Sequence, residues 1–387
     1  MAAHTSAIGF FVRTGARDES PEVMGVSHFL EHMMFKGTAT RTSDDVNRAF
    51  DEMGAKSNAY TSSEVTAFHA ATLPERLDEA AEVLADMMRP ALREVDFDTE
   101  RGVILEEIAM YADDPVFELY ETALEQYYGV NPLGHRVLGT PATIAAMTAP
   151  QMRSYFENRY SADNTVVALS GQVDFDKAVR HIEKLCGHWQ ATGTQRTYQG
   201  LDFSARTITR QSAKVQRGYR MLLAPGPSLS DPRRYAAFVM AQLLGGADNS
   251  LMHWALVETG IAEEAEAAFD PRDGVGDLRL FVAAPPDRLD EAWAIATKQV
   301  ELLPGAISDD DVSRIVAKVA TGVVIAGERP DGRMHRLGRQ WAYGLPYISL
   351  EEELAIIERV TVADVRALLA AYPFAPATVA TLLPEAA

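Results

Sequence analysis

The stretch VSHFLEHMMFKG, residues 26–37, combines an amphipathic helical pattern with two histidines at metal-ligand spacing. Residues four apart lie one above the other on a helix, so His28 and His32 can direct two imidazole rings at one ion. Glu31 lies beside them on the same side of the helix. The other faces carry apolar residues that would bury the helix against a core, namely Val26, Phe29, Leu30, Met33 and Met34. The pattern therefore predicts a helix that ends at Gly37 and presents a metal-binding face.

A second predicted helix, residues 98–111, supplies the acid that such a site still needs, because a catalytic zinc usually has three protein ligands and a water. Glu100 and Glu107 are seven residues apart, two helical turns, and so share one face, whereas Glu106 points elsewhere. The spacing leaves open which of the two binds the metal and which one supports a ligand instead. Chance alone produces the pattern H-x-x-[DE]-H in about 3 of 100 chains of this composition. A surface helix with two solvated histidines is therefore the alternative, which the amphipathic pattern and the second acidic helix oppose.

The length of the chain, 387 residues, exceeds the size at which one hydrophobic core usually stops growing, so we expect two domains. An internal repeat supports two related halves, because six residues recur at one offset (357 − 144 = 213): Ile144, Thr148, Arg153, Thr165, Val166 and Leu169 recur as Ile357, Thr361, Arg366, Thr378, Val379 and Leu382. The shared unit is a capped helix followed by an apolar strand. We expect a zinc-binding catalytic domain over 1–190, a polar linker over 191–210, and a related second domain without the metal motif over 211–387.

Periodic patterns predict helices and strands in alternation, without the strict rhythm of parallel βαβ units. Strands are expected over 6–13, 58–68, 165–170, 214–223 and 377–383. Further helices are expected over 44–53, 77–88, 116–128 and 234–244. This alternation predicts layered α/β or α+β domains.

Composition argues against several classes of function. The formal charge of −19 repels nucleic-acid phosphates and favours basic peptides or a basic partner, although an acidic surface kept for solubility is an equal alternative. No apolar run reaches the roughly 18 residues of a membrane span. No signal-peptide pattern opens the chain, so we expect a cytoplasmic protein that does not enter a membrane. The one cysteine, Cys186, excludes a cysteine-based zinc site and an internal disulfide.

Residues 25–38 resemble the metal-binding motif of the pitrilysin family, the inverzincin peptidases that include insulin-degrading enzyme and the mitochondrial processing peptidase. Other segments also resemble that family: residues 58–61 its substrate-binding edge strand, residues 100–111 and 113–115 its glutamate helix, and residues 132–134 and 138–140 two shorter motifs. The resemblance covers nearly the whole chain and is more specific in the first half. It implies an α+β fold of two related domains, each a mixed or antiparallel sheet layered with helices.

The resemblance also implies roles for individual residues. His28, His32 and Glu107 are expected to bind one zinc ion per chain. Glu31 is expected to act as the general base in metal-assisted hydrolysis of an amide bond, and Glu100 to support the site.

By the same resemblance, a peptide substrate is expected to bind as an added β-strand along Asn58, Ala59, Tyr60 and Thr61. Members of the family usually carry a further strand before the one at 6–13. Either the chain is truncated, or a partner chain or another strand covers that edge of the sheet, because an uncovered edge invites unwanted pairing.

The second half departs from the family pattern. Active members with both halves in one chain carry an arginine and a tyrosine there, which contact substrate and stabilise the oxyanion. Aligned on Gly260, this sequence has Ser250 and Glu263 at those positions. We therefore expect a heterodimer in which a homologous chain supplies the arginine and tyrosine. The alternatives are a non-catalytic scaffold subunit of a larger complex, which the intact zinc motif opposes, and a lone-chain peptidase in which Arg210, Arg217 or another side chain of the second half substitutes.

Overall fold

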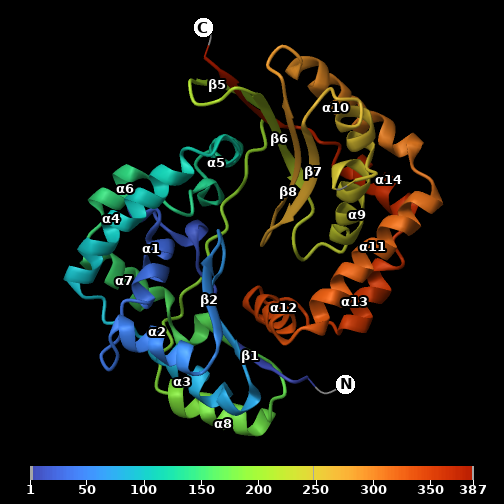
Figure 1. Ribbon diagram of the computed structural model, residues 1–387. Coiled ribbons are helices and arrows are strands. Elements are labelled where there is room, and N and C mark those ends of the chain that lie inside the picture. The colour runs from blue at the N-terminus through green and yellow to red at the C-terminus, as the bar shows by residue number, and fades with distance from the viewer. Residues whose placement is uncertain (1–2, 247, 386–387) are drawn as a thin grey trace. The chain divides into compact units, whose positions relative to one another are not determined.

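The computed structural model describes residues 3–246 and 248–385, and Figure 1 labels its elements. The chain forms two compact units. Unit 1 comprises residues 1–109, 135–197 and 324–347, and unit 2 comprises residues 110–134, 198–323 and 348–387. None of the helices within the described ranges has the length and apolar character that crossing a lipid bilayer requires.

Unit 1 is built on a four-stranded antiparallel sheet in the order β2-β3-β1-β4. Its strands are β1 (Ser6–Val12), β2 (Lys56–Thr61), β3 (Thr66–Thr72) and β4 (Thr165–Gly171). The central strand β1 is buried along its whole length because both of its faces are apolar, with Ile8 and Phe10 on one side and Ala7 and Phe11 on the other. The strand β2 lies at an edge of the sheet and pairs with β3.

Helices cover both faces of this sheet. They are α1 (Val26–Met34), α2 (Ser43–Glu52), α3 (Leu77–Met87), α4 (Glu94–Tyr111), α6 (Pro141–Ala146), α7 (Ala149–Arg159), α8 (Phe175–Cys186) and α12 (Pro330–Ala342). α1 and α3 pack on the face that carries Phe10 and Phe68, and α12 packs on the face that carries Phe11. The helix with the histidine motif, α1, thereby contacts β2 and β3 directly.

Close packing of α12 on the sheet depends on Gly338, which faces the ring of Phe11. A Cβ at this position would overlap the Phe11 ring, which is fully buried. We expect Gly338→Ala to lower the free energy of unfolding by about 1–3 kcal/mol, the usual cost of overpacking. The matched variant Gly102→Ala, on α4 where a Cβ meets nothing within 4 Å, should instead raise it by up to about 1 kcal/mol in the same urea titrations. Equal shifts for the two variants would contradict the close packing of α12.

Unit 2 has a five-stranded sheet in the order β5-β9-β6-β8-β7, in which β5 runs parallel to β9 and the other pairs are antiparallel. The strands are β5 (Arg206–Ser212), β6 (Gly218–Gly226), β7 (Glu264–Pro271), β8 (Gly276–Ala284) and β9 (Thr378–Pro384). The helices are α5 (Pro115–Tyr128), α9 (Arg234–Gly245), α10 (Leu289–Ala306), most of α11 (Asp309–Glu328), α13 (Leu350–Ile357) and α14 (Val362–Ala371). α5 packs on β6 and β9, α9 on β7, and α10 on β8.

The two sheets repeat one strand order, since β7-β8-β6-β9 in unit 2 corresponds to β2-β3-β1-β4 in unit 1. β4 begins at Thr165 and β9 at Thr378, which reproduces the repeat offset (378 − 165 = 213). The helices before them, α7 and α14, both begin with a capping box on a threonine, Thr148 and Thr361. The predicted fold class, two related α+β domains, is confirmed. β5 is the strand of unit 2 without a counterpart in the described part of unit 1.

Each unit also takes one helix from the other half of the sequence. α5 belongs to the first half but packs in unit 2, and α12 belongs to the second half but covers the sheet of unit 1. The division into domains at 1–190 and 211–387 describes the two halves of the sequence and stays a prediction. Each compact unit is instead made of three separate segments of the chain. The expected linker, 191–210, is partly anchored, because Arg196 is buried within unit 1 and β5 begins at Arg206.

The single strand expected over 58–68 is wrong, because the chain reverses there between β2 and β3. Ser62 closes the turn: its backbone N–H donates to the carbonyl of Val65 at 2.9 Å, and its hydroxyl accepts the N–H of Val65 at 3.0 Å. Serine hydroxyls offer the backbone such local hydrogen bonds, which favours a turn over a continued strand. The strand expected from residue 214 begins only at Gly218, and the other expected elements are present with small shifts at their ends.

Candidate metal centre

The helix α1 carries the histidine motif but begins without a side-chain cap of its own, since its N-cap is Gly25 with a φ of 94°. The carboxylate of Glu19 supplies the cap from outside the helix. It accepts the N–H of Gly25 at 2.6 Å and the N–H of Ser27 at 2.8 Å. Glu19 is buried. Because of these two hydrogen bonds, its carboxylate lies at the N-terminus of α1, the positive end of the helix dipole. This cap orders the turn that carries His28.

The donor atoms of His28, His32 and Glu107 converge within unit 1 and lie within 4.8 Å of one another. The Oε2 atom of Glu107 lies 3.7 Å from Nε2 of His28 and 3.5 Å from Nε2 of His32. Ligands about 2.0–2.1 Å from a tetrahedral zinc lie roughly 3.3–3.4 Å apart, close to these separations. Two imidazoles and one carboxylate are also a donor set found in catalytic zinc sites, so these residues fit the ion. In the described part of the chain, no other cluster of histidines, cysteines and acids has this geometry.

Two acids on α4 contact different sides of His32. Oε1 of Glu100 lies 2.8 Å from Nδ1 of His32, whereas Glu107 lies near the other ring nitrogen, Nε2. A hydrogen bond from Nδ1–H leaves the lone pair on Nε2 available for a metal. Lys36 forms an ion pair with the other oxygen of Glu100, with Nζ 2.6 Å from Oε2. Glu107 is therefore one of the converging donor residues, and Glu100 contacts the His32 ring on its Nδ1 side. Glu106 is exposed.

Burial keeps His28 in the neutral form that binds metals. Its side chain is 10% exposed, and its ring centroid lies 4.7 Å from that of His32. Burial in the first place, and the nearby charge of His32 in the second, lower the pKa of His28 to about 3. Because a metal ligand must be deprotonated, His28 is available to a metal at ordinary pH without first losing a proton.

Glu31 accepts a hydrogen bond from the hydroxyl of Thr61, with Oγ1 2.6 Å from Oε2. Burial is the main cause that raises the pKa of Glu31, and the charge of Glu107 adds to it, whereas the hydrogen bond from Thr61 and the charge of His32 act in the opposite direction. A carboxylate with a raised pKa beside a metal centre has the proton affinity that a general base needs.

The edge strand β2 brings only part of the expected substrate-binding set to the metal side of the sheet, because side chains alternate along a strand. Ala59 packs with the core beneath α1, and Thr61 contacts Glu31. Tyr60 packs on the opposite face with the core that includes α12 residues, and the alternation puts Asn58 on that face too. The outer edge of β2 has no strand partner in the described sheet. Its backbone is therefore the part of the strand that could pair with a peptide.

The buried cap residue Glu19 makes the stability of the chain depend on pH. Burial raises its pKa from 4.5 to about 7, so between these values the folded state holds a proton that the unfolded state has lost. Stability is therefore lost as pH rises through this window, by about 3 kcal/mol in all. We expect Glu19→Gln to flatten the change of unfolding free energy between pH 4.5 and 7 in urea titrations of the metal-free chain. The exposed control Glu22→Gln should leave the wild-type slope, and an unchanged slope in Glu19→Gln would contradict the assignment.

In the second half, the residues at the family's arginine and tyrosine positions make other contacts within unit 2. Ser250 is buried, and its hydroxyl accepts a backbone N–H. Glu263 pairs with Arg217 at 2.7 Å, and Arg210 pairs with Glu118 at 2.9 Å. Both arginines considered as substitutes are thus already paired with carboxylates.

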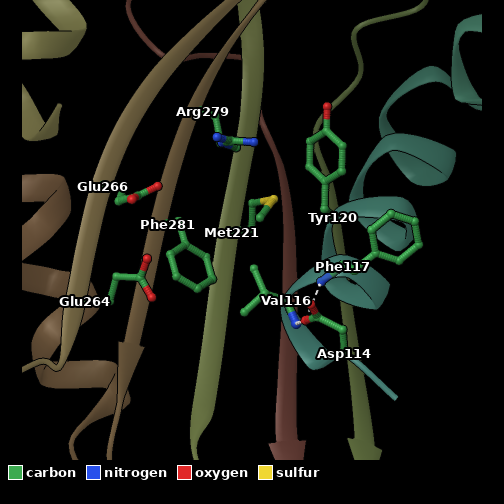
Figure 2. Close-up of a pocket in the computed structure, with 9 residues that line it drawn as sticks. All are labelled: Asp114, Val116, Phe117, Tyr120, Met221, Glu264, Glu266, Arg279 and Phe281. Carbon is green, nitrogen blue, oxygen red and sulfur yellow. Dashed lines mark hydrogen bonds between the residues drawn. The ribbon is translucent and has the colours of Figure 1, made fainter. Parts of the chain in front are cut away.

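Unit 2 also has a pocket of about 290 Å³ between α5 and the sheet, shown in Figure 2. Charged and apolar side chains line it: Asp114, Val116, Phe117, Tyr120, Met221, Glu264, Glu266, Arg279 and Phe281. Glu264 and Glu266 lie two residues apart on one face of β7, and burial followed by the charge of Glu266 raises the pKa of Glu264. With three carboxylates and one guanidinium, the lining suits a cationic group, but it shares no residue with the metal centre.

Two contacts of the metal centre were missed at the level of sequence. Glu19 lies six residues before Gly25, outside the spacing of any local capping motif, so no sequence pattern indicated its role. Lys36 lies four residues after His32, a spacing that places two side chains on one helical face and could have indicated it.

Comparison with known proteins supports a peptidase relationship over almost the whole chain. The family model described as "Insulinase (Peptidase family M16)" matches residues 1–141, which contain the metal centre, and "Peptidase M16 inactive domain" matches residues 146–319. A protein of Streptomyces coelicolor named an uncharacterized zinc protease is 30% identical over 380 residues, covering 95% of this chain and 82% of the relative. Another uncharacterized zinc protease, from Mycobacterium leprae, is 32% identical over 375 residues, covering 95% of this chain and 84% of the relative.

A protease from Helicobacter pylori has the same fold, with a TM-score of 0.93 at 19% identity, over 99% of this chain and 95% of that one. The predicted resemblance to insulin-degrading enzyme and its relatives is therefore confirmed, and the zinc-protease names agree with the donor set found here. This chain belongs to the insulinase family of peptidases, family M16.

Proposed function

We propose that the chain is the zinc-bearing subunit of a metalloendopeptidase that acts together with a homologous chain. The observation that supports this most directly is the convergence of the His28, His32 and Glu107 donor atoms at separations that suit one zinc ion. The intact set also favours this proposal over a scaffold subunit, which would have no need to keep Glu31 and Thr61 hydrogen-bonded beside those atoms.

The protein residues have distinct parts in the proposed hydrolysis. His28, His32 and Glu107 would hold a zinc ion, which would supply polarisation of the scissile carbonyl and a lowered pKa of water, about 7. Glu31 accepts the proton of the attacking water and passes it to the leaving amine. Glu100 holds the ring of His32 through Nδ1.

The open edge of β2 is the proposed binding site for the peptide backbone. A peptide that adds to this edge would hydrogen-bond mainly through its main chain, which makes recognition tolerant of sequence. β2 ends at Thr61, the residue that contacts Glu31, so a peptide on this edge runs toward the proposed base. The acidic pocket of unit 2 and the net charge of −19 both favour substrates with basic residues.

A partner chain is proposed because this chain does not have, at the two aligned positions of its second half, the arginine and tyrosine that stabilise the oxyanion in the family. Ser250 and Glu263 stand at the two family positions, and Glu263 is paired with Arg217. Loss of one oxyanion donor typically costs about 3–4 kcal/mol of transition-state stabilisation, a factor of several hundred in rate. A homologous chain that carries the arginine and tyrosine would restore it.

The test is a peptide-hydrolysis assay on the zinc-loaded chain, alone and with the homologous chain that co-purifies from the native source. We expect little activity from the chain alone and an increase of at least about a hundredfold with the partner, abolished by chelator and restored by zinc. Full activity of the chain alone would contradict the division of labour. A zinc-loaded complex that cleaves no peptide, basic or otherwise, would contradict the peptidase proposal itself.

A further inference from the structure

Thr61 is the last residue of β2, and its hydroxyl is directed at another side chain of the metal centre. Its Oγ1 donates to Oε2 of Glu31 at 2.6 Å, a short hydrogen bond of the kind that a charged acceptor forms. With Asn58 and Tyr60 on the other face and Ala59 apolar, Thr61 is the residue of the 58–61 set that can donate a side-chain hydrogen bond on the metal side.

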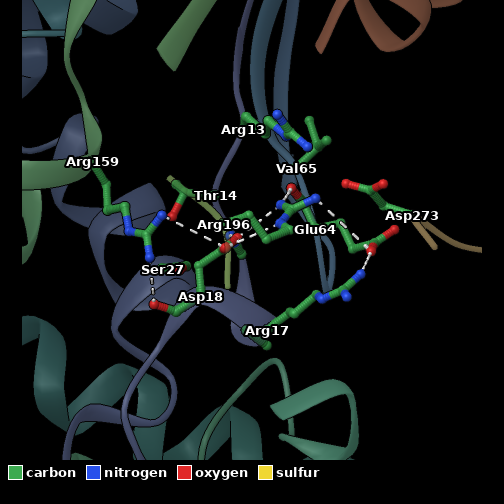
Figure 3. Close-up of polar contacts among 12 residues, drawn as sticks. Arg13, Thr14, Arg17, Asp18, Ser27, Glu64, Val65, Arg159, Arg196 and Asp273 are labelled. Atoms are coloured by element: carbon green, nitrogen blue, oxygen red, sulfur yellow. Dashed lines mark hydrogen bonds and ion pairs between the residues drawn. The ribbon is translucent and has the colours of Figure 1, made fainter. Parts of the chain in front are cut away.

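The turn that follows Thr61 is fixed by a buried polar frame, shown in Figure 3. The backbone N–H of Arg17 donates to the carbonyl of Ser63 at 2.8 Å, and the Arg17 guanidinium pairs with Glu64 at 2.5 Å. Arg196 pairs with Asp18 at 2.8 Å and donates to the carbonyl of Glu64 at 2.6 Å. The side chains of Arg196 and Asp18 are each 1% exposed, so this frame is buried and rigid.

The same segment also fixes the helix that carries Glu31. The backbone N–H groups of Ala16 and Arg17 donate to the turn after Thr61, and Glu19, two residues further on, caps the first turn of α1. Both partners of the Thr61–Glu31 hydrogen bond are therefore attached to one short segment. That segment therefore fixes the backbone from which each of the two side chains extends.

We propose that Thr61 is a positioning residue that holds the carboxylate of Glu31 in its catalytic orientation. This rests on the proposed function, in which Glu31 is the general base. The bond occupies Oε2 and leaves Oε1 to receive the proton of the attacking water. Because Thr61 also ends the strand proposed to bind the peptide backbone, the strand that aligns the substrate is the one that aligns the base.

This role of the Thr61 side chain is separate from the backbone pairing with substrate that the family resemblance implied for residues 58–61. A hydroxyl committed to Glu31 is not available to donate to a peptide. Removal of the hydroxyl should therefore act on the turnover step and leave peptide binding through the β2 backbone largely unchanged.

The first measurement is a double-mutant cycle on the zinc-free chain, which needs neither metal nor activity. Thr61→Val keeps the shape of the side chain and removes the donor, and Glu31→Ala removes the acceptor. We expect Thr61→Val to lower the urea midpoint of unfolding when Glu31 is present and to leave it unchanged in the Glu31→Ala background. Thr61→Ser, which keeps the hydroxyl, should preserve most of the wild-type coupling.

The second measurement is peptide hydrolysis by the zinc-loaded complex with its partner chain. Thr61→Val should lower kcat about ten- to hundredfold, in the range found for residues that orient groups of a metal site, with KM and zinc content unchanged. Thr61→Ser should recover most of the kcat.

Three results would overturn this inference: additive midpoint shifts in the cycle, an unchanged kcat in Thr61→Val, or a rise in KM as the main effect. A wild-type complex without zinc-dependent hydrolysis would contradict the proposed function instead, whatever the cycle shows.

Discussion

Glu31→Gln is expected to lower kcat/KM for peptide hydrolysis by about 10²- to 10⁴-fold, the usual contribution of a general acid or base. The substitution keeps the size of the side chain and an oxygen that can accept from Thr61, but the amide cannot take the proton of the attacking water. Glu31 is not one of the three converging donor residues, so zinc should remain bound at one ion per chain. The measurement is steady-state hydrolysis by the complex with its partner, alongside metal analysis of each variant.

The control for this prediction is Glu52→Gln, an exposed glutamate on α2 that should behave as wild type. A Glu31→Gln variant that retains zinc and more than about a tenth of the wild-type kcat/KM would show that another group accepts the proton. A variant that loses both zinc and activity would instead show that Glu31 supports the metal rather than the proton transfer.

Glu107→Gln is expected to weaken zinc binding by more than the roughly 10–100-fold typical of residues that only orient a ligand, and to abolish hydrolysis with it. The substitution removes the anionic oxygen that lies 3.7 Å and 3.5 Å from the two histidine nitrogens. A neutral amide oxygen is a much poorer partner for zinc than a carboxylate. The affinity is best measured by competition with a chromogenic chelator, because this readout does not depend on activity.

The adjacent residue provides a matched control for this prediction. Glu106→Gln makes the same chemical change one position away, where the side chain is exposed and points away from the donor atoms. It should leave zinc affinity and hydrolysis unchanged. Equal losses in the two variants would mean that the acidic helix contributes overall charge rather than one ligand.

Much of the metal centre could be predicted from the sequence because it depends on helical periodicity. The spacing of His28, Glu31 and His32 places all three on one side of any helix they occupy, and the apolar residues between them require that helix to pack. The spacing of Glu100 and Glu107 predicted a shared face but left their roles open. The structure separates the two, because Glu107 lies near both Nε2 atoms and Glu100 lies at Nδ1 of His32.

Other features of the fold and of the metal centre depend on contacts between distant segments, so no local sequence pattern predicted them. The run over 58–68 reads as one strand by composition, yet the hydrogen bonds of Ser62 turn it into a hairpin. α12 reads as an ordinary amphipathic helix, and its place on the sheet of unit 1 depends on its fit against Phe11. The cap of α1 by Glu19 links residues too far apart for a capping motif.

The sequence by itself predicted a metal site with two histidines and an acid from a second helix, and it predicted the two-fold repeat of the fold. These predictions follow from residue types and from the helical and strand periodicities of the sequence. Local backbone geometry sets those periodicities, whatever the surrounding tertiary structure. Only the tertiary structure decided which carboxylate lies near both imidazoles, and that the hydroxyl of Thr61 donates a hydrogen bond to Glu31. Those outcomes depend on the packing of segments tens of residues apart, where a shift of one residue along a strand would turn every side chain to the opposite face.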